Sequence, residues 1–171
     1  PGARTVPDTE TLALEPGAHD LVIHGLSMHW AADPVGQLVQ CRRALAPDGL
    51  FLGVLFGGQT LAELRAALAE AESRLTGGLS PRVLPFGELR DLGALLQRAG
   101  FALPVADLST QVATYPDLRA LMRDLRAMGE ANALAMRERR PARPTLFETA
   151  ESLYRATFAT PEGRLGIIPG G

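Results

Sequence analysis

The stretch from His19 to Phe56 constrains the fold of this chain more than any other. Its expected elements are a strand from Asp20 to His24, a helix from Pro34 to Leu45, a turn at Pro47 to Gly49 and a strand from Leu50 to Phe56. The helix is well marked, because Asp33 suits the N-cap and Pro34 suits the first helical position. A strand, a helix and a strand form the building block of a parallel sheet, so the sequence predicts an α/β fold.

The second strand and the segments after it extend this prediction. Leu50 to Phe56 is nearly all apolar, which is typical of a strand that is covered on both faces. Thr60 with Glu63, and Thr145 with Glu148, each indicate a capping box at the start of a helix. Further expected elements are an extended piece at Ala3 to Val6, helices at Gly87 to Ala99, Pro116 to Met128 and Asn132 to Arg140, a helix to about Phe158, and a strand within Phe101 to Ala113. We therefore expect one domain over 1–171, with a sheet-forming core at 1–113 and a helical insertion or lid at 114–160.

Composition limits the function classes. The chain is 46% hydrophobic with a formal net charge of −2, which is typical of a globular protein and gives no support for a nucleic-acid surface. It contains no apolar run of transmembrane length. Cys41 is its single cysteine, which excludes an internal disulfide and fits a reducing compartment. We therefore expect a cytoplasmic, bacterial protein with no membrane span and no nucleic-acid partner.

Several motifs resemble, in their order and spacing, those of the class I S-adenosylmethionine (SAM) methyltransferases. Asp8 to Leu12 is similar to the acid-containing loop after the third strand of that family, and Ala46 to Phe51 to the turn before its fifth strand. A narrower resemblance is to the biotin-synthesis malonyl-carrier-protein methyltransferases and to the methyltransferase-like assembly factor of respiratory complex I. The motifs that carry it are Met28-His29-Trp30, Phe56-Gly57-Gly58, Gly77 to Arg82, Pro85-Phe86 and Asp124 to Asn132.

The resemblance implies a Rossmann-like fold, a parallel sheet flanked by helices, with SAM as the cofactor and S-adenosylhomocysteine as its product. It implies that Asp8 and Thr9 lie at the adenine and that His24, Gly25 and Leu26 face the methionine part, because ligands sit at the carboxyl ends of parallel strands. Two features of the family are absent from the sequence: a Gly-x-Gly-x-Gly loop and an acid for the ribose hydroxyls. The N-terminal strands are thus expected to be missing, which leaves the SAM site half built. The family's last, antiparallel strand would run where Leu165 to Gly171 stops.

His29 and Trp30 are the catalytic candidates, on the acceptor side. A histidine there could orient an acceptor carboxylate, and a tryptophan could exclude water, although packing against the following helix is the commoner role of a tryptophan. We expect no metal site, because His19 and His24 fall on opposite faces of a strand. A basic cluster at Arg137 to Arg143 could dock an acidic carrier protein or another protein, although such runs are usually solvated.

Three functions stay open. The first is a SAM-dependent methyltransferase acting on a carboxyl or similar group, a reaction that needs positioning more than catalytic side chains. The second, from the resemblance to the assembly factor, is SAM-dependent hydroxylation of an arginine in a respiratory-complex subunit. The third is a non-catalytic module of the same fold that binds a partner. An apolar sheet edge left by missing strands would also predict a homodimer.

Overall fold

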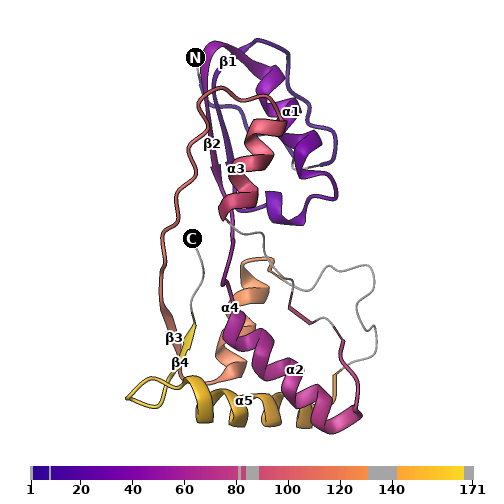
Figure 1. The fold of residues 1–171 in the computed structure, drawn as a ribbon, viewed down its shortest axis with the longest axis vertical. Helices are drawn as coiled ribbons and strands as arrows, with labels where there is room; N and C mark the ends of the chain where they lie inside the picture. Colours follow the sequence, from indigo (N-terminus) through magenta and orange to yellow (C-terminus); the bar gives the residue numbers. More distant parts are fainter. Residues whose placement is uncertain (1, 8, 81, 84–88, 131–141, 168–171) are drawn as a thin grey trace. The chain divides into compact units, whose positions relative to one another are not determined.

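The computed structural model describes residues 2–7, 9–80, 82–83, 89–130 and 142–167. Contacts divide the chain into two compact units (Figure 1). The sheet unit comprises Pro1–Gly58, Phe86–Leu108 and Gly171, and the helical unit comprises Gln59–Pro85 and Ser109–Gly170. The expected division at residue 113 stays a prediction, and the contacts group 59–85 with the C-terminal helices. None of the helices in the described ranges is long and apolar enough to cross a membrane.

The sheet unit contains two parallel strands, β1 (His19–Gly25) and β2 (Leu45–Val54), which confirms the predicted parallel pairing. The register runs from Leu21 opposite Leu50 to Gly25 opposite Val54. The turn expected at 47–49 is wrong, because β2 already begins at Leu45. The backbone there is irregular instead: the register shifts between His19 and Leu21, and Asp48 has a φ of 62°.

The two faces of this sheet differ sharply in exposure. Five aliphatic side chains alternate along the strands on one face and are 46–66% exposed: Leu21, Ile23, Leu50, Leu52 and Val54. The intervening positions include the half-buried Val22 and Phe51 and the buried His24. The expectation that Leu50 to Phe56 is covered on both faces is therefore wrong for the described residues. Alternation with a period of two gives one apolar face in contact with the core and one apolar face in contact with solvent.

Two helices pack on the covered face, α1 (Pro34–Ala44) and α3 (Leu89–Arg98). Their contact buries Leu38 and Ala99, with Phe51 of β2 packed against them. Asp33 caps α1 as predicted: its carboxylate accepts from the Gly36 N–H at 2.9 Å. Two expectations nearby fail, because Ala3 to Val6 forms no regular element and the strand expected within 101–113 begins only at its last residue.

The helical unit is built from α2 (Ala62–Thr76), α4 (Leu118–Ala127) and α5 (Pro144–Phe158), with α5 packed along α2 (Figure 1). An antiparallel pair, β3 (Ala113–Tyr115) and β4 (Leu165–Ile167), completes it. Its core contains ten buried residues: Leu64, Ala67, Leu68, Ala71, Leu118, Leu121, Leu146, Ala150, Tyr154 and Leu165. The segment from Leu165, where the sequence was expected to stop short of the family's last strand, forms the short antiparallel strand β4 over its first three residues.

Both predicted capping boxes are wrong in this unit. The N-cap of α2 is Leu61, in a left-handed conformation with φ 54°, and the N-cap of α5 is Arg143. Neither residue donates or accepts a side-chain capping hydrogen bond. Thr145 lies inside the first turn of α5, where Pro144 already occupies a position that needs no N–H donor. The helix expected at Asn132 to Arg140 lies outside the described residues.

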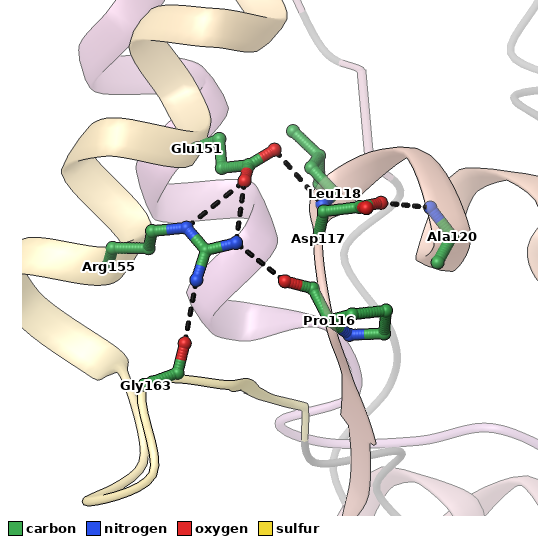
Figure 2. Close-up of polar contacts among 7 residues, drawn as sticks. All are labelled: Pro116, Asp117, Leu118, Ala120, Glu151, Arg155 and Gly163. Carbon is green, nitrogen blue, oxygen red and sulfur yellow. Dashed lines mark hydrogen bonds and ion pairs between the residues drawn. The ribbon is translucent and has the colours of Figure 1, made fainter.

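Arg155 ties three segments of the helical unit together (Figure 2). Its guanidinium donates to the carbonyl oxygens of Gly163 and Pro116, both at 2.6 Å, and to the carboxylate of Glu151 at 2.7 and 3.0 Å. Glu151 in turn accepts from the Leu118 N–H at 3.2 Å. One side chain therefore joins the turn at Gly163 before β4, the residue before the start of α4, and the helix α5.

Glu72 organises the loop after α2 in a comparable way. Its side chain is 7% exposed, accepts from the Ser80 N–H at 2.8 Å and pairs with Arg82 at 2.6 Å. Burial alone would raise the pKa of this carboxyl, but the hydrogen bonds from Arg82 and Ser80 and the charge of Arg82 together hold it below its usual range. Glu72 therefore stabilises the fold in its ionised form.

Candidate cofactor and acceptor site

Five of the predicted site residues lie at or directly after the carboxyl end of β1, within the sheet unit: His24, Gly25, Leu26, His29 and Trp30. β1 ends at Gly25, and the segment after it enters a short 3₁₀ helix, η1 (Met28–Trp30). This end of a parallel sheet is where successive loops converge and where ligands bind in α/β folds. The location that the motifs implied for the cofactor stays a prediction at this edge.

The loop at 9–12 is fixed beside α1 by two glutamine side chains. Gln40 accepts from the Leu12 N–H at 2.7 Å and donates to the Glu10 carbonyl at 2.8 Å. Gln37 donates to the carbonyl of Thr9 at 3.2 Å. Because both glutamines lie on the same helix, three positions apart, α1 holds the loop at two points.

A second contact links this loop to the segment after η1. The carboxylate of Glu10 accepts from the Ala32 N–H at 3.0 Å. Thr9 is the one residue predicted at the adenine that lies in the described ranges. Its hydroxyl donates to the Thr11 carbonyl at 2.7 Å, so it shapes the loop. Asp8, predicted at the adenine, lies outside the described residues.

Gly25 and Leu26 form an open position at the end of β1. A Cβ placed on Gly25 would meet no atom within 4 Å, so space is available over this backbone. Leu26 has a φ of 54°, is 49% exposed and donates its N–H to the Val54 carbonyl at 2.7 Å. His24 is buried at 8% exposure, so its side chain lies within the protein and not on the open position.

Three aromatic rings cluster in the segments that follow β1 and β2. The His29 ring lies 5.1 Å from that of Trp30 and 5.4 Å from that of Phe56, measured between centroids. All three side chains are half-buried. His29 and Trp30 come from η1, and Phe56 follows β2, so the ends of both strands contribute. Such a cluster provides an apolar, partly water-excluded wall with one titratable ring in it.

Sequence reasoning did not select four residues that build this edge. Phe56 was noted only as part of a family motif, although its position directly after a strand indicated the same edge as His29. Glu10, Gln37 and Gln40 carry the contacts that hold the loop. No local pattern marks a glutamine on a helix as a loop anchor, because its partner lies 28 to 30 residues away.

The described residues fit SAM along one side. The open backbone at Gly25 and the anchored loop at 9–12 can accept the methionine and adenine parts, since a backbone without a side chain allows close approach. They include no glycine-rich loop after a first strand.

Comparison with known proteins gives a consistent result. The chain is 39% identical over 165 residues to the mitochondrial arginine-hydroxylase NDUFAF5 of Mus musculus, covering 96% of this chain and 48% of that protein. It is 37% identical over 163 residues to that of Danio rerio, covering 95% and 50%. It is 35% identical over 158 residues to the malonyl-[acyl-carrier protein] O-methyltransferase of Halorhodospira halophila, covering 92% and 52%. No family model matches.

A solved structure shows the same fold. A Bacillus halodurans protein described as a methyltransferase superposes with a TM-score of 0.51 at 14% identity, covering 94% of this chain and 70% of that one. The fold is thus that of a class I methyltransferase. Over nearly its whole length the chain is similar to NDUFAF5 and to the malonyl-[acyl-carrier protein] O-methyltransferases, and it spans about half the length of the curated relatives it matches.

Proposed function

We propose that this chain is part of a SAM-dependent methyltransferase that acts on a carboxyl or similar acceptor. The observation that carries the proposal is the carboxyl edge of β1 and β2, where an open glycine, an anchored loop and an aromatic cluster converge. The relatives named malonyl-[acyl-carrier protein] O-methyltransferase support a carboxyl acceptor. SAM, when bound, would supply a methyl group to the acceptor oxygen. The electron pair of the broken C–S bond would stay on sulfur, which leaves S-adenosylhomocysteine.

The residues of this edge divide into two roles. Asp8, Thr9, His24, Gly25 and Leu26 are proposed for the cofactor side. Since the hydroxyl of Thr9 is engaged and the His24 side chain is buried, we assign these two residues to shaping the site. His29 and Trp30 are proposed for the acceptor side, where their half-buried rings would exclude water and orient an anionic group.

Substitution of His29 separates these roles. His29→Ala is expected to reduce kcat with a methyl acceptor by about tenfold or more, as for other acid–base or orienting groups. Binding of S-adenosylhomocysteine should change little, because the ring lies on the acceptor side. His29→Phe, which keeps the ring contacts with Trp30 and Phe56, should not restore activity if the imidazole is needed. Full activity of His29→Ala would contradict the assignment.

Arginine hydroxylation is the second candidate, supported by identities of 37–39% to arginine-hydroxylases over nearly the whole chain. The partner would then be a respiratory-complex subunit instead of an acidic carrier protein. Mass spectrometry of either partner after incubation with SAM and dioxygen distinguishes the two, because methylation adds about 14 Da and hydroxylation, with dioxygen as oxidant and source of the oxygen atom, adds about 16 Da. A partner that gains neither mass would favour the third candidate, a partner-binding module without catalysis.

Location and assembly are proposed on narrower grounds. A cytoplasmic location in a bacterium is supported by bacterial relatives and by the single, buried Cys41, although the NDUFAF5 relatives are mitochondrial. For a protein that consists of residues 1–171, we propose a homodimer in which a second copy covers the exposed aliphatic sheet face. Analytical ultracentrifugation should then show dimers that Ile23→Lys dissociates. Monomers of the unsubstituted chain would exclude the homodimer.

A further inference from the structure

A groove of about 450 Å³ lies between α4 and α5 in the helical unit. Met122 and Phe147, both packed against the helical core, line it with apolar surface. Arg119 and Arg126 also line it, and with Met122 they follow a spacing of three and four residues along α4. That spacing puts the three side chains on one face of the helix, so an apolar centre lies between two cations.

The cations of this face are not neutralised within the described structure. Arg119, Arg123 and Arg126 are exposed, and none forms an ion pair or side-chain hydrogen bond with a described residue. Arg143, next in sequence to two lining residues, is also exposed and makes no such contact. An exposed guanidinium without a partner is available for a carboxylate, which it can bind through two parallel hydrogen bonds.

The acids of the same region are mostly occupied. Asp117 accepts from the Ala120 N–H at 2.7 Å, and Asp124 lies near Tyr115, where burial and the Asp124 charge raise the pKa of the tyrosine hydroxyl. Glu151 lines the groove but is held by Arg155 and the Leu118 N–H (Figure 2). Glu148 alone lines the groove without a described partner. The groove therefore combines an apolar floor with an excess of free positive charge.

We infer that this groove docks an acidic, amphipathic segment of a partner protein. One apolar side chain of the segment would enter between Met122 and Phe147, and its carboxylates would pair with Arg119 and Arg126. A volume within the range of about 300–1,000 Å³ typical of binding pockets suits one or two such side chains. Helix-in-groove recognition combines apolar anchors and complementary rim charge in this way. The inference does not depend on methyl transfer, since the groove lies within the helical unit alone.

The test uses a fluorescein-labelled synthetic helix with leucine at positions one, four and eight of its apolar face and glutamate around it. Its anisotropy is titrated with the intact protein at low and high salt. The expected result is saturable binding that weakens with salt and is about tenfold weaker for Arg119→Glu/Arg126→Glu, as two rim charges would give. Equal affinity for the double variant would overturn the proposal.

Two controls separate docking from general charge attraction. Arg43→Glu reverses an exposed arginine on α1 of the sheet unit and should leave the affinity unchanged. A peptide with the same glutamates but serine in place of leucine should bind at least tenfold more weakly, because the apolar floor would contribute nothing. Equal binding of the two peptides would overturn the proposal, as would no binding of the leucine peptide to the unsubstituted protein. Circular dichroism of each variant should match the unsubstituted protein.

Discussion

The helical unit and the sheet unit bury their apolar residues to very different degrees. The helical unit encloses ten buried side chains between its own helices and β4, with Tyr154 and Leu165 fully buried. The sheet unit buries Met28, Leu38 and Ala99 on one face of its strands and leaves five aliphatic side chains exposed on the other. The comparison teaches that the helical unit buries its apolar side chains among its own helices and β4. The sheet unit, in contrast, has an exposed aliphatic face of the kind that other protein surfaces usually cover.

The largest expected effect tests the closed core directly. Tyr154→Ala should lower the free energy of unfolding by about 3–5 kcal/mol, since it empties a fully buried aromatic site and removes the hydroxyl donor to the Gly166 carbonyl. Ile23→Ala, at a side chain that is 66% exposed in the single chain, should change the free energy of unfolding of the monomer by less than about 0.5 kcal/mol. Urea denaturation followed by circular dichroism measures both. Similar losses for the two variants would contradict the comparison.

Next in size is the Arg155 contact. Arg155→Met should cost about 2 kcal/mol, because it leaves the carbonyls of Gly163 and Pro116 and the carboxylate of Glu151 without their shared donor. Arg74→Met is the matched control, since its pair with Glu70 is exposed and should be worth about 0–0.5 kcal/mol. Hydrogen exchange should localise the Arg155→Met effect to the starts of α4 and β4. If the protection from hydrogen exchange stayed unchanged at these positions, the Arg155 side chain would not join the segments.

Glu72 adds a pH dependence to the helical unit. Its pKa is lower in the folded state than in the unfolded state, so its stabilising effect is complete above the unfolded value of about 4.3. The effect is lost as the pH falls through the lowered folded value. Glu72→Gln should cost about 1–2 kcal/mol at neutral pH and reduce the loss of stability on acidification.

Glu70→Gln is the control for this prediction. Its side chain is 53% exposed and, among the described residues, pairs only with Arg74 one helical turn away, so Glu70→Gln should leave the loss of stability at acidic pH unchanged. Unfolding midpoints measured between pH 3 and pH 7 compare the two variants. Identical curves for Glu72→Gln and Glu70→Gln would contradict the role of Glu72.

The smallest stability effect compares one helix start from each unit. Asp33→Ala should cost about 1 kcal/mol, because it removes the acceptor of the Gly36 N–H in the sheet unit. Gly36→Ala should cost a similar amount, since its Cβ would lie 2.3 Å from an Asp33 carboxylate oxygen and displace the cap. Thr145→Ala should stay within about 0.5 kcal/mol, because Thr145 lies beyond the N-cap of α5. Thermal unfolding ranks the three variants.

Sequence alone predicted the parts whose signals are local. The Asp33 cap and the helix after it were recovered because the donor and acceptor are three residues apart. The capping boxes at Thr60 and Thr145 failed because the chain enters those helices through Leu61 and Arg143 instead. The β2 start was missed because Pro47 to Gly49 has turn composition, yet the backbone continues as an irregular strand paired with β1.

For the candidate site, too, local signals could be used in the sequence and long-range contacts could not. The edge that carries Gly25 and His29 was predicted from strand ends and family motifs, both visible in sequence. The exposure of one sheet face could not be predicted. The apolar sequence of a strand indicates that both of its faces are buried, but it does not show which residues bury them. The glutamine anchors of the 9–12 loop are long-range contacts for which a single sequence contains no signal.

The most direct test of the central claim is calorimetric titration of S-adenosylhomocysteine into the protein translated from its whole reading frame, beside its Gly25→Leu and Gly93→Leu variants. A Cβ at either glycine would meet no atom within 4 Å, so neither substitution introduces a clash at its Cβ. The account predicts binding that Gly25→Leu weakens at least tenfold, by about 1.4 kcal/mol or more, and that Gly93→Leu leaves unchanged. Absence of binding, or equal binding to all three proteins, would contradict a cofactor site at the end of β1.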